Sequence, residues 1–494
     1  MLKHLMNSIT RLAISIGTLA TTGVLAAATI TVTTSQDAPV GTLGSECTLR
    51  AAIASANDGT AHDGCSADSA NADDIVFAAS LAGQTLTLTE GQLAIVSELT
   101  ITGPEPGNAA AFVIDADGNS RIFHVEIPSG SFEVFEAGLS SLTLTGGSTS
   151  GTGERGGAIA AVDTDLVLEY VHVIGNTTTA SGQNAQGGGI SNNGGALTLH
   201  HSTVAGNSTS GGAKGGGISI TLGELTMIAS NVSDNTASGN FSIGGGISLF
   251  RSDALIVDSK ISGNTVQGER TEGGGIGGWP GSAELTIIDT TISGNTADGA
   301  LTKGGGLFLS SSSFGDTHAT VINSTLSGNA ATDPDTDGGG GIWVDEDATL
   351  TLIHATIANN IAENGTAGIH LEPDAGAVVM NNSLLVQADA GESGCSEQLA
   401  TSNSLATDAS CTGTATPAAD IALDALQDNG GPTPTHALGA SSVAIDAAGD
   451  CEADFGLTAD QRGRSRPGIL DRPCDIGAFE FQDTVFHDRF DQHR

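Results

Sequence analysis

The acidic residues with the clearest potential for chemistry are Asp258 and Asp289, which occupy the same place in two successive copies of an internal repeat. If the copies stack as neighbouring strands, the two carboxyl groups lie about 5 Å apart. Carboxyl groups at that distance can split their pKa values, so that one acts as an acid and the other as a nucleophile or base. The alternative is a solvent-facing polar row without chemistry. The row holds residues six positions before a recurring Asn: Tyr170, His201, Asp258, Asp289, Asn323, His354 and Asn381.

A second acidic group, Asp333, Asp335 and Asp337, alternates with other residues and ends in a glycine. This spacing is typical of loops that wrap carboxylate oxygens around calcium. Val344 stands where an EF-hand would place its final Glu, although three acidic residues follow it. The sequence therefore predicts calcium ligands here, with a solvated acidic loop as the alternative. No other cofactor is implied.

Aromatic platforms for sugars are scarce, because Trp279 and Trp343 are the two tryptophans of the chain. Each follows a glycine cluster, which predicts that both lie on one face and contact a ligand; ordinary packing is the alternative. Lys214 and Lys303 precede glycine clusters in non-adjacent copies. Nucleophile-elbow, zinc-protease and phosphate-loop motifs do not occur. The sequence thus shows no complete catalytic site.

The element that must position these residues is a repeat of 27–35 residues. Each copy carries a glycine cluster followed by an aliphatic residue and, in phase with it, an aliphatic residue three positions before an Asn. Two or three short β-branched strands per copy, separated by Gly and Asn, predict one coil of a solenoid. The glycine clusters end at Ile159, Ile190, Ile218, Ile247, Ile276, Leu307 and Ile342, and the Asn positions are 176, 207, 235, 264, 295, 329 and 360.

An isolated coil of this kind cannot cover its own apolar interior, whereas stacked coils can. We therefore predict an all-β, single-stranded right-handed parallel β-helix over residues 111–390, with the Asn side chains hydrogen-bonded along the stack and placed at left-handed corners. A propeller is the competing architecture, but its blades carry more aromatic residues.

Composition and the N-terminus indicate export. Lys3 and Arg11 precede an apolar stretch that ends in small residues, which predicts a signal peptide over residues 1–28 rather than a membrane anchor. The formal net charge of -40 excludes nucleic acid as a partner. No later stretch is long and apolar enough to span a bilayer, and we expect a monomer.

The six cysteines form three local pairs without the close spacing of a zinc site, and an exported chain favours disulfides. The predicted pairs are Cys47 with Cys65, Cys395 with Cys411, and Cys451 with Cys474. All lie outside the repeats, so they are expected to staple the two ends.

The N-terminal segment 29–110 contains Cys47-Thr48-Leu49-Arg50-Ala51, followed by helical apolar spacing up to Asn57. It resembles the CSLREA domain of bacterial secreted proteins, with Thr48 and Ala51 in place of that family's Ser and Glu. The spacing predicts a short helix that covers the first coil, followed by the first strands.

The segment 391–482 contains Asp460-Gln461-Arg462-Gly463 and the run from Cys474 to Glu480. It resembles the choice-of-anchor Q domain, which implies a β-helix context and delivery to the cell exterior but no catalytic activity. The Gly-Gly-Ala-Ile and Asn repeats are similar to those of polymorphic outer-membrane adhesins. The tail 483–494 resembles short sorting tails of exported proteins, although Arg489 and Asp491 depart from their pattern.

The sequence therefore predicts a secreted or surface-displayed protein that functions in adhesion or in binding a glycan or another cell-surface ligand. The first alternative is a carbohydrate-active enzyme, a lyase or a hydrolase, since such enzymes use this fold. The second alternative is a passive surface stalk. Clustering of Asp, Lys and Trp on one face would favour recognition or catalysis, whereas a smooth polar face would favour the stalk.

Overall fold

One turn of the chain shows the architecture. The strands β23 (Asp253–Val257) and β24 (Lys260–Ser262) are separated by a corner, β25 (Thr265–Glu272) projects from the body, and β26 (Ile276–Trp279) closes the turn. Each strand pairs in parallel with its counterpart in the next turn, for example Ile261 with Ile292 and Ile276 with Leu307. The protein is thus a parallel β-helix, as predicted, of about ten turns.

The structure, a computed structural model, describes residues 29–482 apart from 67–72, 129, 132, 181–184, 280, 282, 312–314, 333–337, 364, 388–392 and 469–471. The predicted signal peptide, the C-terminal tail and the calcium ligands Asp333, Asp335 and Asp337 lie outside these residues. Within them, no helix is long and apolar enough to cross a membrane.

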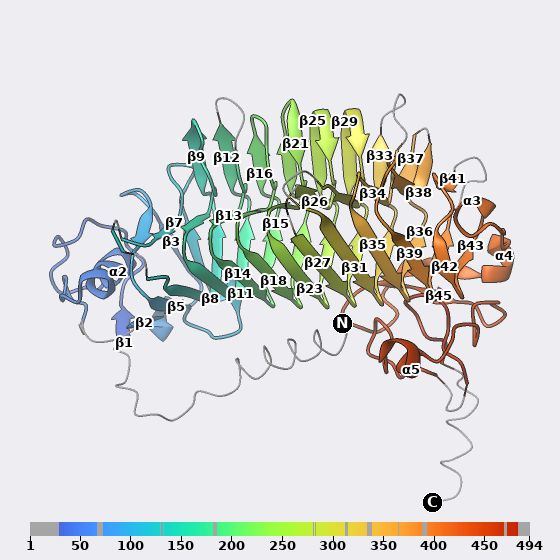
Figure 1. The fold of residues 1–494 in the computed structure, drawn as a ribbon. Helices are drawn as coiled ribbons and strands as arrows, with labels where there is room; N and C mark the ends of the chain where they lie inside the picture. Colours follow the sequence, from blue (N-terminus) through green and yellow to red (C-terminus); the bar gives the residue numbers. More distant parts are fainter. Residues whose placement is uncertain are drawn as a thin grey trace, which may run out of the picture.

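Three long sheets run along the axis (Figure 1). Sheet A takes two strands from each turn, such as β23 and β24; sheet B takes one, such as β26; sheet C takes the projecting strand, such as β25. Sheet C forms the crest along the top of Figure 1. The sequence predicted two or three strands per turn and missed sheet C, because its strands are polar and interrupted by glycines such as Gly268 and Gly299.

The core is continuous from Ile30 to Cys411 and consists of aliphatic side chains that point into the coil. Ile261 and Ile292, each three residues before a repeat Asn, are fully buried, as predicted. The glycine clusters line up along the axis because the backbones of neighbouring turns meet there. A Cβ added to Gly274 would lie 2.3 Å from the carbonyl oxygen of Gly305.

The repeat asparagines form a buried ladder. The Nδ2 of Asn264 donates to the Oδ1 of Asn295 at 2.9 Å and to the carbonyl oxygen of Val232 at 2.9 Å, and the contact between side chains recurs from Asn176 to Asn360. The predicted stacking is confirmed. The predicted left-handed Asn is wrong, because the preceding residue takes that conformation instead, for example Gly263 (φ 65°). The Asn is thereby free to point inward.

A second ladder of small hydroxyl residues supports the corner inside sheet A. The backbone N–H of Ser230 donates to the Oγ of Ser259, and that of Ser259 to the Oγ1 of Thr290. These side chains are buried, as predicted for the position five residues before the Asn.

The two ends are closed differently. The helix α2 (Leu49–Asp58) begins at Thr48, whose hydroxyl caps it, and packs Leu49, Ala52 and Ile53 onto the first turn. At the other end, α3 (Ala409–Thr412) contributes Cys411 to the same core, next to Cys395. All three predicted disulfides are present.

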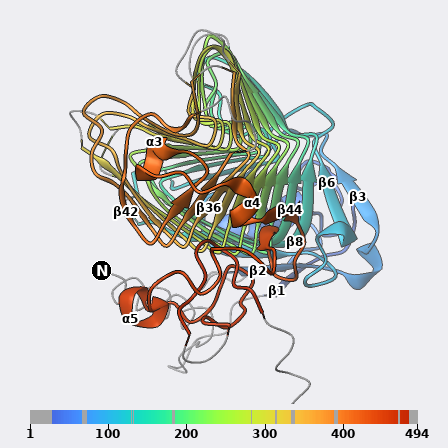
Figure 2. The same cartoon turned by 90° about the vertical axis from the view of Figure 1, so that its right-hand side faces the viewer.

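Residues 423–482, here named the C-terminal lobe, lie against the side of the solenoid below sheet A (Figure 2). The lobe contains β44 (Leu423–Gln427), β45 (Thr435–Leu438) and α5 (Cys451–Phe455). It covers β28 (Thr291–Ser293), β32 (Thr325–Ser327), β36 (Thr356–Ala358) and β40 (Leu384–Val386).

We predict that Asn264→Ala lowers the free energy of unfolding by about 2–4 kcal/mol, because it removes two donated bonds and leaves the N–H and Nδ2 of Asn235 without their acceptor. Thermal and urea unfolding followed by circular dichroism measure the loss. Asn240→Ala, at an exposed position, is the matched control. Equal stability of the two variants would contradict a structural role for the ladder.

Candidate functional site

Asp258 and Asp289 both occupy the corner between the two sheet A strands of their turns. They have left-handed backbone angles, φ 50° and φ 51°, and follow one another in consecutive turns. The whole polar row shares this conformation, with Asn382 rather than the predicted Asn381 in its place. Asn381 instead ends a strand and pairs with Ile353. The row is therefore a stack of corner residues.

Asp289 lies where the C-terminal lobe meets the solenoid. Thr433 donates its hydroxyl to the main-chain oxygen of Asp289 at 3.0 Å. The Oδ1 of Asp289 is buried and has no hydrogen-bond partner in the described part of the chain. Burial, followed by the negative charge of Asp258, raises the pKa of Asp289 to about 7. Burial also raises the pKa of Asp258. The C-terminal lobe thus packs against Asp289. The catalytic role of Asp258 and Asp289 stays a prediction.

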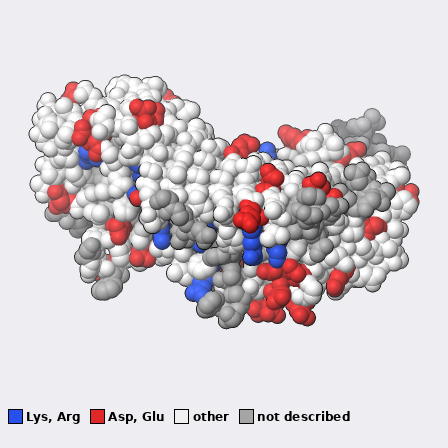
Figure 3. Space-filling model, turned by 90° about the horizontal axis from the view of Figure 1, so that it is seen from above, with Lys and Arg blue, Asp and Glu red and all other residues white. Residues whose placement is uncertain are grey.

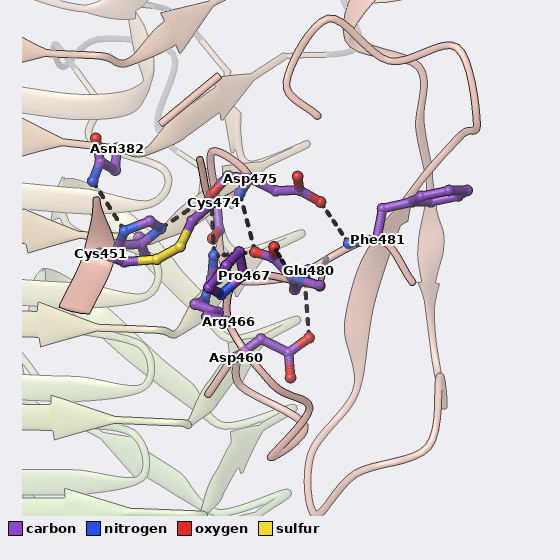
Figure 4. A network of polar contacts seen from close by, with 12 residues as sticks. Asn382, Cys451, Asp460, Arg466, Pro467, Cys474, Asp475, Glu480 and Phe481 are labelled. Carbon is purple, nitrogen blue, oxygen red and sulfur yellow. Dashed lines mark hydrogen bonds and ion pairs between the residues drawn. A yellow bond between two sulfur atoms is a disulfide. The ribbon is translucent and has the colours of Figure 1, made fainter. Parts of the chain in front are cut away.

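The motif residues of the lobe build a buried polar network (Figure 4). The fully buried Arg466 donates to Glu480 Oε2 at 2.9 Å and to the carbonyl oxygens of Asp475 and Gly477. Burial raises the pKa of Glu480 to about 7, although the charge of Arg466 opposes this. Asp460 accepts from Arg462 and from the backbone N–H of Glu480. These residues hold the lobe together.

Gln461 joins the lobe to the solenoid. Its Nε2 donates to the hydroxyls of Thr291 at 2.9 Å and Thr433 at 2.8 Å, and its Oε1 accepts from Thr325 at 2.6 Å. The side chain is completely buried. Gln461 therefore forms hydrogen bonds with threonines of two consecutive turns, and these bonds fix the position of the lobe.

Trp343 lies on the outer face of sheet B, in β34 (Ile342–Val344). It is only 4% exposed. Its ring stacks on His370, with centroids 3.9 Å apart, and Lys303 Nζ lies 4.6 Å from its centroid. Trp279 ends β26, where its backbone is in register with Phe250. Trp343 is therefore covered by a charged side chain rather than presented as an open platform.

The cation above Trp343 belongs to a compact group of charges. Lys303 pairs with Asp345 at 3.3 Å and with Glu372 at 3.0 Å, and Arg270 pairs with Glu272 at 2.6 Å. Burial raises the pKa of Glu272, although the charge of Arg270 opposes this. The Oε2 of Glu272 has no hydrogen-bond partner among the described residues. We name these five residues the junction cluster, since they lie where sheet C meets sheet B.

Two rows of residues face this junction, one on sheet C and one that begins in isolated bridges and continues into sheet C. The upper row comprises Phe241, Arg270 and Leu301, which pair in register; Arg270 lies 5.1 Å from the Phe241 ring, and Leu301 is 51% exposed. The second row, here named the foot row, precedes the glycine clusters. It comprises Arg155, Gln186, Lys214, Ile243, Glu272 and Lys303.

Seen from above, the few lysine and arginine side chains lie in separate patches, several of them directly against acidic side chains (Figure 3). Sequence reasoning noted Lys214 and Lys303 but dismissed them as non-adjacent, and it missed Arg270 and Glu272 as site residues. The available signal was the shared position immediately before each glycine cluster. For the metal prediction, the described residues contain no group of three or more His, Cys, Asp or Glu placed to hold an ion.

Comparisons with known proteins give one structural likeness. The solved structure of the pectate lyase Pel9A aligns with 89% of this chain and 92% of its own chain, at 13% sequence identity and a TM-score of 0.40. No protein-family model and no curated protein matches the chain. The likenesses of the two ends to the CSLREA and choice-of-anchor Q domains therefore stay predictions.

We predict that Asp289→Asn stabilises the protein at about pH 8 by about 2–4 kcal/mol and has little effect at about pH 3.5. A carboxyl group whose pKa rises from 3.8 to about 7 on folding destabilises the fold progressively between those values and fully above them. The neutral amide removes that cost. It also removes the repulsion from Asp258 and Asp460, while Asn323 and Arg466 remain nearby.

Melting temperatures at both pH values measure this effect. Asp424→Asn, at an exposed position of the lobe, is the control and should change neither value. A loss of stability in Asp289→Asn at the higher pH would show that the ionised carboxylate is a favourable partner in the interface.

Proposed function

We propose that the chain is a carbohydrate-binding protein that acts outside the cell and contacts its ligand at the junction of sheets B and C. The observation that carries this proposal is the clustering of five charges with Trp343 and His370 on consecutive turns. Most of the surrounding solenoid surface presents Ser, Thr, Asn and Gly. A concentrated group of charged and aromatic side chains is more typical of a recognition site than of a passive stalk.

The upper row supports this proposal from the exposed side. Leu301 offers an apolar surface beside Arg270, whose side chain is 48% exposed. Sugars combine apolar C–H faces with hydroxyl groups, so an aliphatic side chain next to charged donors and acceptors matches their chemistry. The three disulfides support an oxidising compartment, where glycans of the cell surface would be available.

A carbohydrate-active enzyme is the second candidate, and Glu272 is the observation that favours it. A buried carboxyl group with a raised pKa can serve as a general acid, and its Oε2 has no partner in the described structure. Asp345, which pairs with Lys303, would be the second carboxyl group of the catalytic pair. Asp258 and Asp289 form the competing pair in this proposal.

The test is a panel of acidic and neutral polysaccharides, screened with the purified chain for binding and for the release of new chain ends. We expect binding that Leu301→Ser weakens about fivefold, since it removes an apolar contact. Ile361→Ser is the matched control, because Ile361 is 50% exposed, like Leu301, but lies elsewhere on sheet C. Its strand register leads through Ala330 to Thr296, which is at the opposite end of β29 (Thr296–Lys303) from Leu301. Absence of binding to every polysaccharide would contradict the proposal.

New chain ends that disappear in Glu272→Gln, with binding retained, would favour the enzyme. New chain ends that persist in this variant would exclude Glu272 as the acid.

A further inference from the structure

The charge of the foot-row side chains changes along the solenoid. Its first three members, Arg155, Gln186 and Lys214, are cationic or amide side chains in consecutive turns. After Ile243, the row continues with Glu272 and Lys303, which belong to the junction cluster. Successive turns are about 4.8 Å apart, so Arg155 and Lys214 are about 10 Å apart along the axis. A polymer lying along the axis would therefore meet one foot-row residue at each turn.

The residues beside the foot row on sheet B follow the same division. The sheet B residue five positions after each foot-row residue is Ala160 in the turn of Arg155, and then Ser191, Ser219 and Ser248 in the next three turns. In register with them, the row continues with Gly277 and then with Phe308, Trp343 and His370. The junction thus has a cationic half bordered by small and hydroxyl side chains, and an aromatic half in which two cations pair with three carboxyl groups.

The cationic half gathers like charges in a strongly acidic protein. Of seven Lys and Arg residues between positions 111 and 390, five lie at the junction: Arg121, Arg155, Lys214, Arg270 and Lys303. Burial and the positive charge of Arg155 lower the pKa of Lys214. Arg121, Arg270 and Lys303 pair with carboxylates of the chain, so the repulsion between like charges concerns Arg155 and Lys214. Holding these two cations near one another favours an anionic partner.

Gln186, between the two cations, marks the same place independently. It is 7% exposed, and its Oε1 is buried without a hydrogen-bond partner in the described part of the chain. A buried polar atom of this kind is expected to find a partner in a ligand or in water. Across sheet B, at its other edge, a cavity of about 510 Å³ is lined by three carboxylates, Asp165, Glu224 and Asp253, and by one cation, Arg251. Because the carboxylates outnumber the cation there, this edge favours a polyanion less than the junction does.

We infer that the foot row at Arg155, Gln186 and Lys214 binds the anionic group of an acidic polysaccharide that lies along the solenoid axis. This inference rests on the proposed function and specifies its ligand class. The anionic group is a carboxylate or a sulfate ester, both of which accept charge-assisted hydrogen bonds from Lys and Arg. The junction cluster, about three turns or about 14 Å further along the axis, then contacts a more distant sugar of the same polymer.

The test uses three polymers with one backbone: dextran, carboxymethyl dextran and dextran sulfate. We expect at least one charged dextran to bind more tightly than dextran itself, with an affinity that falls as salt is added. The protein's net charge of -40 makes non-specific attraction of a polyanion an implausible source of binding. Preference between the two charged polymers identifies the group as carboxylate or sulfate.

Lys214→Ala and Arg155→Ala should each weaken binding of the charged dextran about tenfold, since each removes a charge-assisted hydrogen bond. Lys214→Arg should retain most of the affinity, because it keeps the charge. Lys260→Ala, on β24 in sheet A, is the matched control and should bind like the unmodified chain. Melting temperatures identify any variant whose fold is impaired. If an alanine variant at position 155 or 214 is impaired, the affinities of Lys214→Arg and Lys260→Ala for the charged dextran are compared instead.

Equal affinity for the three dextrans, or unchanged binding in Lys214→Ala and Arg155→Ala, would overturn the inference. So would failure of both charged dextrans to bind at low salt. These outcomes differ from failure of the proposed function, which requires that no polysaccharide of the wider panel binds. Neutral polymers that bind and are weakened by Leu301→Ser would leave the proposed function standing without this ligand class.

Discussion

The constraint on which the structure depends is that no turn can cover its own interior. Each coil exposes an aliphatic face and a set of polar backbone groups on both sides, and only the neighbouring coils satisfy them. The buried Asn ladder shows how strict this requirement is. Each side-chain oxygen accepts from the backbone and the side chain of the preceding ladder member, so a shift of one residue in one turn would leave several buried groups without partners.

Because stacking fixes the inward residues, functional variation is confined to outward positions that repeat once per turn. A repeat of this kind converts one sequence position into a row along the axis, with neighbouring members about 4.8 Å apart. The corner row accommodates Tyr170, Asp289 and His354 without changing the coil, and the foot row accommodates Lys214 and Glu272 in the same way. A functional site in such a protein is therefore formed by equivalent outward positions of successive turns. Its residues are far apart in the sequence but adjacent in space.

The β-helix, the inward-facing positions, the helix over the first turn and the three disulfides could be predicted because each leaves a local and repeated signal. Sheet C could not, since strands such as Thr265–Glu272 lack the aliphatic alternation that marks a buried strand. The candidate site at the junction of sheets B and C was harder to predict from the sequence. Lys303, Trp343 and Glu372 are brought together by stacking across three turns, and their contacts depend on side-chain reach rather than on spacing. The shift from Asn381 to Asn382 arises because the turn after Asn360 has no ladder Asn from which to count, whereas the strand register, with Leu385 opposite Ile357, places Asn382 at the corner.

The C-terminal lobe shares its apolar core with the solenoid. Leu438, Ile476 and Phe479 of the lobe, and Ile421 just before it, share a buried cluster with Leu384 and Val386 of β40 and with Ala358 of the preceding turn. The lobe therefore lacks a full interior until those turns exist, and Gln461 finds its two threonines only when β28 and β32 are already stacked. Attachment of the lobe therefore reports that these turns have assembled, because only a chain in which β28 to β40 are stacked offers the surface on which residues 423–482 can fold.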